Sequence, residues 1–81
     1  DRALRLVAER RWAEAVEPLQ QALLARPSAK LEVLLGIVRA RQAAVEGDLT
    51  GARALYQAVL DLQPGHPVAQ RELLMVAAMD A

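Results

Sequence analysis

The sequence predicts an all-α fold, and three observations carry that prediction. Ala, Leu, Arg, Gln and Glu dominate the 81 residues, there is no Phe, and β-branched residues are mostly isolated valines, so the intrinsic preference is helical. Apolar residues recur at the three-and-four spacing of one helix face. Residue pairs and clusters rich in Arg, Pro or Gly separate these segments. Five helices in one small domain, residues 1–81, are therefore expected.

The first two expected helices lie before Pro27. One runs from about Asp1 to Glu9 and is short. The next begins near Trp12 and repeats apolar residues on one face. That stripe consists of Trp12, Ala15, Val16, Leu19, Ala22 and Leu23. Pro18 lies opposite the stripe and near the first turn, where a lost backbone hydrogen bond costs least, so we expect a slight kink and no break.

The third expected helix runs from Ser28, a good N-cap, to Glu46. At 1.5 Å per residue it is about 27 Å long, roughly a turn longer than its neighbours. Its apolar side comprises Leu31, Leu34, Leu35, Val38 and Val45.

Two more helices follow. The fourth opens at Asp48, another N-cap, and presents Leu49, Ala52, Tyr56, Val59 and Leu60. The fifth begins at Pro67, since a first helical residue needs no intrahelical N–H bond. It carries Val68, Leu73, Leu74, Val76 and Met79.

The second and fourth segments are similar to each other. When Pro27 is aligned with Pro64, Ala15 falls on Ala52 and Leu19 on Tyr56. A small residue, then a large apolar residue four positions on, then a closing proline resembles the second helix of a tetratricopeptide repeat. The proline-to-proline distance exceeds the family period of about 34 residues, and we assign the three extra residues to the long third helix.

The helices between these copies match the family less closely. Leu35-Gly36 resembles its Leu-Gly pair, but Arg39 stands where an aromatic residue would follow. The resemblance implies antiparallel helical hairpins stacked as an α-solenoid, with two repeats and a trailing helix. It also implies a concave groove lined by the first helix of each pair.

The groove residues that the resemblance implies are Leu34, Ile37, Arg41, Val68, Arg71 and Met75, with Leu4 and Val7 from the first helix. Arg41 and Arg71 are candidates for carboxylate contacts, because a guanidinium can hold both oxygens of an acid. The alternative is that they pair with Glu46 or Glu72 in solvent. Members of the family that clamp a chaperone's chain terminus use lysine and asparagine too, and this chain has one lysine and no asparagine.

Composition argues against several functions. Ten basic and ten acidic residues cancel, so no diffuse positive field favours nucleic acid. The apolar run Val33 to Val38 is too short to insert into a membrane. No cysteine is present, His66 is the only histidine and fits a loop or helix-cap role, and Ser28 is the only serine. We expect no metal site, cofactor or catalytic group.

The sequence thus predicts a non-catalytic protein–protein interaction module that binds a protein or peptide. The alternative is a structural spacer or oligomerisation segment of a larger bacterial assembly or secretion protein. We expect the chain to be a fragment of a longer protein, and two repeats fall short of the roughly three that a stack usually needs, which favours self-association. A binder should leave Leu34, Ile37, Arg41 and Arg71 exposed, whereas a spacer should bury them. The compartment, cytoplasmic or periplasmic, stays open.

Overall fold

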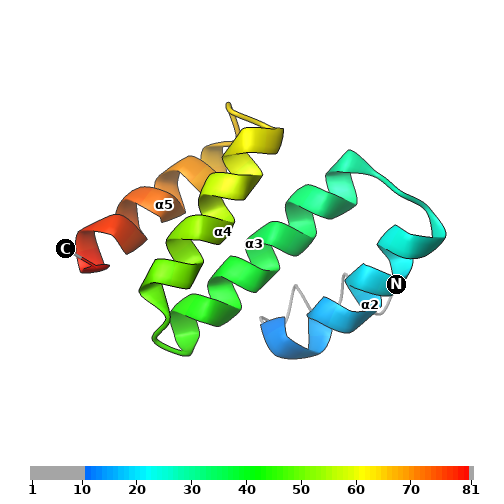
Figure 1. Cartoon of the computed structure of the whole chain (residues 1–81), viewed down its shortest axis with the longest axis horizontal. Coiled ribbons are helices and arrows are strands. Elements are labelled where there is room, and N and C mark those ends of the chain that lie inside the picture. The colour runs from blue at the N-terminus through cyan, green and yellow to red at the C-terminus, as the bar shows by residue number, and fades with distance from the viewer. Residues whose placement is uncertain (1–10, 81) are drawn as a thin grey trace.

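The computed structural model of the chain describes residues 11–80 as four α-helices (Figure 1). They are α2 (Trp12–Ala25), α3 (Ala29–Val45), α4 (Leu49–Leu62) and α5 (Pro67–Asp80). This part of the chain contains no β-strand, which confirms the all-α class. The helix expected over about Asp1 to Glu9, with its groove residues Leu4 and Val7, lies outside the described residues.

Side chains at the loops fix where three of the helices begin. The Ser28 hydroxyl accepts a hydrogen bond from the Leu31 N–H at 3.4 Å, and Asp48 Oδ1 accepts one from the Gly51 N–H at 2.8 Å. Each bond satisfies one of the free N–H groups of a first turn. Pro67 is the first residue of α5. These three helix starts are where the sequence predicts them.

The prolines lie where the sequence predicts. Pro27 and Pro64 fall between helices, while α2 continues as one helix through Pro18. Helix α3 has 17 residues against 14 in each of the other three, so it is three residues longer, as expected. The turn after it contains Gly47 at φ 87°, a left-handed conformation that glycine adopts without steric cost.

Each helix packs against the next one along the chain, and consecutive helices run in opposite directions (Figure 1). Helix α3 therefore lies between α2 and α4 and buries two sides. Val33, Ile37 and Ala40 belong to one buried cluster, and Leu35 and Val38 to another. A helix covered on two sides shows weaker amphipathic patterning than a surface helix.

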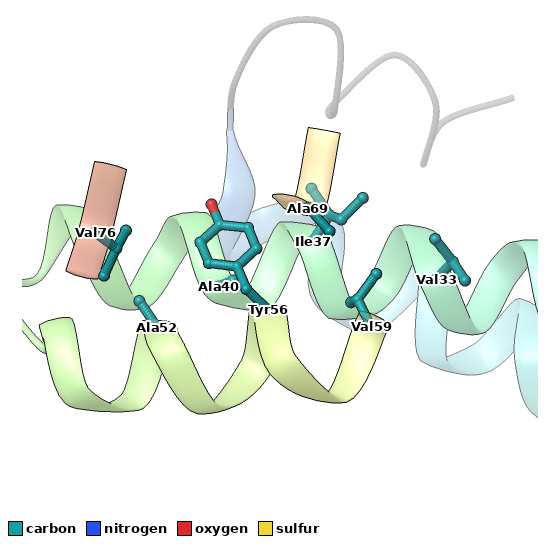
Figure 2. Packing of buried hydrophobic residues seen from close by; sticks show 8 residues of the cluster. All are labelled: Val33, Ile37, Ala40, Ala52, Tyr56, Val59, Ala69 and Val76. Atoms are coloured by element: carbon teal, nitrogen blue, oxygen red, sulfur yellow. The ribbon is translucent and has the colours of Figure 1, made fainter. Parts of the chain in front are cut away.

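The larger group, which we call the α3–α5 cluster, joins α3, α4 and α5 (Figure 2). It consists of Val33, Ile37, Ala40, Ala52, Tyr56, Val59, Ala69 and Val76. The smaller group, the α2–α3 cluster, consists of Ala15, Leu19, Leu35 and Val38. Ala15 and Ala52 are both 0% exposed.

Helices α3 and α4 approach closely at Gly36. A Cβ atom at this position would lie 2.5 Å from Cγ2 of Val59, which is nearer than real Cβ contacts allow. Glycine thus lets the two backbones meet with a branched side chain fitted between them.

Candidate functional site

One acidic side chain connects α5 to two other helices. Arg41 of α3 donates from Nε to Glu72 Oε1 at 2.8 Å, and its Nη2 donates to the other carboxylate oxygen. The Tyr56 hydroxyl of α4 donates to Glu72 Oε1 at 2.5 Å. A bidentate arginine–carboxylate contact fixes the orientation of both side chains as well as the distance between them.

The network reaches α2 through an aromatic ring. The guanidinium carbon of Arg41 lies 5.0 Å from the centre of the Trp12 ring, within the range of a cation–π contact. Figure 2 shows the Tyr56 ring rising from α4 with its hydroxyl pointing away from that helix. Trp12, Arg41, Tyr56 and Glu72 therefore link all four described helices, and we call them the four-helix network.

Electrostatics keep this network in one protonation state at neutral pH. The hydrogen bonds from Arg41 lower the pKa of Glu72 below its usual 4.5, although burial opposes this. The same hydrogen bonds raise the pKa of Arg41. Burial, followed by the contact with Glu72, raises the pKa of Tyr56 well above 10. A charged arginine and a charged carboxylate thus face a neutral phenol, and the two charges cancel.

An open hollow of about 470 Å³ lies against the four-helix network. We call it the α3–α5 hollow. Besides the network, it is lined by Arg71 and by apolar residues of α3 and α5. Val45 is 78% exposed, Met75 57% and Met79 60%. The four-helix network thus forms a polar wall whose groups pair with one another, whereas Arg71 and the apolar side chains beside this wall face solvent.

The six predicted groove residues lie at different sites in the structure. Arg41, Arg71 and Met75 line the α3–α5 hollow. Leu34 and Ile37 line a separate hollow of about 260 Å³, together with Lys30, Val33, Gln63 and His66. These two hollows have none of the six residues in common.

Two of the six contribute mainly to packing. Ile37 is only 7% exposed and belongs to the α3–α5 cluster. The prediction that its side chain is exposed is therefore wrong. The reason is that α4 covers this side of α3. Val68 is partly buried against the same cluster.

The alternative for Arg41, a pair with Glu72, is the one found. Their side chains are 31% and 16% exposed, so the pair is partly buried and not in open solvent. His66 accepts a hydrogen bond at Nδ1 from the Ala69 N–H at 3.2 Å. The expected helix-cap role of this histidine is confirmed.

Sequence reasoning did not foresee the four-helix network. Tyr56 was expected in the core and is 2% exposed. Trp12 was expected there too, yet it is partly exposed and its ring contacts Arg41. The Arg41–Glu72 contact joins positions 31 apart in sequence, and such a pair leaves no periodic signal. The sequence offered one indication of this network, because Glu72 was among the residues expected to pair with Arg41 or Arg71.

Two further features bear on function. Within residues 11–80 there is no group of three or more His, Cys, Asp or Glu side chains that could hold a metal ion. No described helix is both long enough and apolar enough to cross a bilayer.

Comparison with protein-family models, with curated proteins and with solved structures finds no match for this chain. Its class is therefore defined by its own structure. It is a small all-helical protein whose described helices pack in chain order.

Proposed function

We propose that the chain is a non-catalytic protein–protein interaction module that docks a protein or peptide segment in the α3–α5 hollow. The observation that carries this proposal is the exposure of Val45, Met75 and Met79 beside a wall of paired polar groups. Clustered apolar side chains at a concave surface are a usual feature of binding sites. Methionine suits such surfaces because its flexible side chain adapts to different partners.

The four-helix network supports docking because it holds the wall of the hollow in place. Its hydrogen bonds are satisfied within the chain, so a ligand meets a preformed surface and less ordering is needed on binding. No buried polar side-chain atom among the described residues lacks a hydrogen-bond partner.

We further propose that the helices form two tetratricopeptide-like repeats. Three features favour this architecture: the equal burial of Ala15 and Ala52, the position of Pro27 and Pro64 after their helices, and the extra length of α3. Small buried residues at equivalent places let successive helices approach closely.

Selection from a peptide library displayed on phage tests the docking function. We expect the immobilised 81-residue chain to enrich peptides, and the double variant Met75→Glu, Met79→Glu to lose them. Both methionines are exposed, so the variant should keep its helical circular dichroism. Leu24→Glu is the matched control, because Leu24 is 84% exposed and does not line the hollow. Enrichment that survives in the double variant would contradict the proposal.

The second candidate function is a structural or oligomerisation segment. The observation that favours it is that α5 exposes Leu74, at 73%, in addition to the two methionines. Sedimentation velocity over a range of concentrations separates the two functions. A binder stays monomeric without a partner, whereas an oligomerisation segment forms a dimer that the double methionine variant disrupts.

A further inference from the structure

Three charged side chains line the α3–α5 hollow, and two of them neutralise each other. Arg41 and Glu72 form the ion pair described above. Arg71 makes no hydrogen bond or ion pair with any residue of the described chain, although its charge acts on Glu72. The hollow therefore has one net positive charge, and that charge belongs to an exposed guanidinium.

Arg41 cannot serve a ligand in the same way. Its Nε and Nη2 groups both donate to Glu72, and its guanidinium carbon lies over the Trp12 ring. A ligand carboxylate can take the Nε–Nη2 edge of Arg41 only by displacing a contact that already satisfies both oxygens of Glu72. Arg41 is thus a positioning residue that holds the wall, and Arg71 is the arginine open to a partner.

The surroundings of Arg71 are apolar. Met75 follows it by four residues and Met79 by eight, so the three side chains lie along one face of α5. Val45 lines the same hollow from the end of α3. A partner that contacts this face meets one positive group followed by flexible apolar side chains.

We propose that the α3–α5 hollow binds a short peptide segment that combines one carboxylate with apolar side chains. The carboxylate pairs with Arg71, and the apolar groups pack on Val45, Met75 and Met79. The charge complementarity selects an acidic partner, since a basic segment would be repelled by the unpaired arginine. This inference rests on the proposed docking function and adds the chemistry of the partner.

Synthetic peptides test it. A sequence enriched in the library selection is made with blocked termini in two forms, one with its Glu or Asp and one with the matching amide. A third form has the amide side chain and a free C-terminal carboxylate, which distinguishes a side-chain acid from a chain terminus. Affinities are measured by fluorescence anisotropy for the wild type, Arg71→Gln and Arg39→Gln. Arg39 is an exposed arginine of α3 that does not line the hollow.

We expect Arg71→Gln to weaken the carboxylate-bearing peptide about fivefold, as for a partly exposed ion pair. Binding of the fully blocked amide form should be unchanged, and Arg39→Gln should change neither. The affinity of the acidic form should also fall as salt is added. Equal weakening of the acidic and amide forms by Arg71→Gln would overturn the inference.

The failure of this inference can be told apart from failure of the docking function. Enriched peptides without Asp, Glu or a free carboxylate, which still need Met75 and Met79, would leave docking intact and remove the acidic partner. No enrichment, together with a dimer that Met75→Glu, Met79→Glu disrupts, would mean that a second copy fills the hollow. Both proposals would then fall.

Discussion

The contact of α2 with α3 differs in kind from the contacts among α3, α4 and α5. Among residues 11–80, the α3–α5 cluster buries eight residues, including Tyr56, whereas the α2–α3 cluster buries four. The N-cap residue of α4, Asp48, makes a side-chain capping hydrogen bond, but the N-cap residue of α2, Arg11, makes none. The stacking of Trp12 on Arg41 adds to the smaller contact. Among the described helices, we therefore expect α3, α4 and α5 to form the more stable unit and α2 to be held less firmly.

Arginine substitutions at two fully buried alanines, one in each cluster, test this comparison most strongly. Ala52→Arg forces a charge between α3 and α4 and should cost at least about 3 kcal/mol of unfolding free energy, enough to unfold the domain. Ala15→Arg makes the same change in the α2–α3 cluster. We expect it to detach α2 and leave α3, α4 and α5 folded. Thermal melts followed by far-ultraviolet circular dichroism measure both.

Hydrogen exchange provides the finer readout. Protection lost only over residues 12–25 in Ala15→Arg would support the comparison. Equal loss throughout both variants would mean that the four helices unfold as one unit. A melting curve unchanged by Ala52→Arg would be incompatible with the close contact of α3 and α4.

Glu72→Gln sharpens the comparison, because Glu72 holds Arg41 within the unit of α3, α4 and α5, and Arg41 in turn contacts Trp12 of α2. Removing its charge weakens the contact with Arg41 and should cost about 1–3 kcal/mol of stability. Trp12 is the only tryptophan, so its fluorescence reports the change directly. We expect a shifted emission maximum in folded Glu72→Gln and none in Glu32→Gln, a matched change at an exposed glutamate of α3.

Acid should act on the same contact. The pKa of Glu72 is lower in the folded protein than its usual 4.5, so the carboxylate stabilises the fold above that value. This stability is lost as the pH falls through the lowered pKa. Urea titrations at a series of pH values should show a steeper acid loss for the wild type than for Glu72→Gln. If the free energy of unfolding fell equally with decreasing pH in both proteins, Glu72 would be excluded as a source of the acid sensitivity.

Gly36→Ala has the smallest expected effect. Alanine improves helix propensity by about 1 kcal/mol, but its Cβ would lie too close to Val59 Cγ2. Valine has few alternative rotamers, so the overpacking outweighs the gain and a net loss of about 1 kcal/mol is expected. In the Val59→Ala background the same change should no longer destabilise. Stabilisation by Gly36→Ala alone would show that α3 and α4 can separate without cost.

Much of this fold could be predicted from interactions between residues that are close in sequence. Ser28, Asp48 and Pro67 mark helix starts by chemistry that involves only neighbouring residues. Ala15 and Ala52 were predicted from their spacing relative to the prolines, and both are fully buried. The extra length of α3 followed from the same spacing.

The candidate site was less accessible to sequence reasoning. Ile37 was assigned to a groove because a repeat-based register assumes one exposed side on α3, whereas this helix is covered by both α2 and α4. The Arg41–Glu72 pair depends on how α3 and α5 meet in space. Charge pairing at that separation has no periodicity from which it could be predicted. Arg71 and Met75 are both exposed and line a hollow, and their exposure depends on the periodicity of α5 alone; their part in binding stays a prediction.

The chain-order packing of the helices also bears on folding kinetics. When each helix contacts the one that follows it, most contacts close short loops, and helical domains with such local contacts fold in microseconds to milliseconds. The Arg41–Glu72 pair closes a much longer loop and therefore forms late, after the helical hairpins have assembled. Stopped-flow or temperature-jump experiments should accordingly find Glu72→Gln unfolding faster than the wild type while it refolds at nearly the same rate.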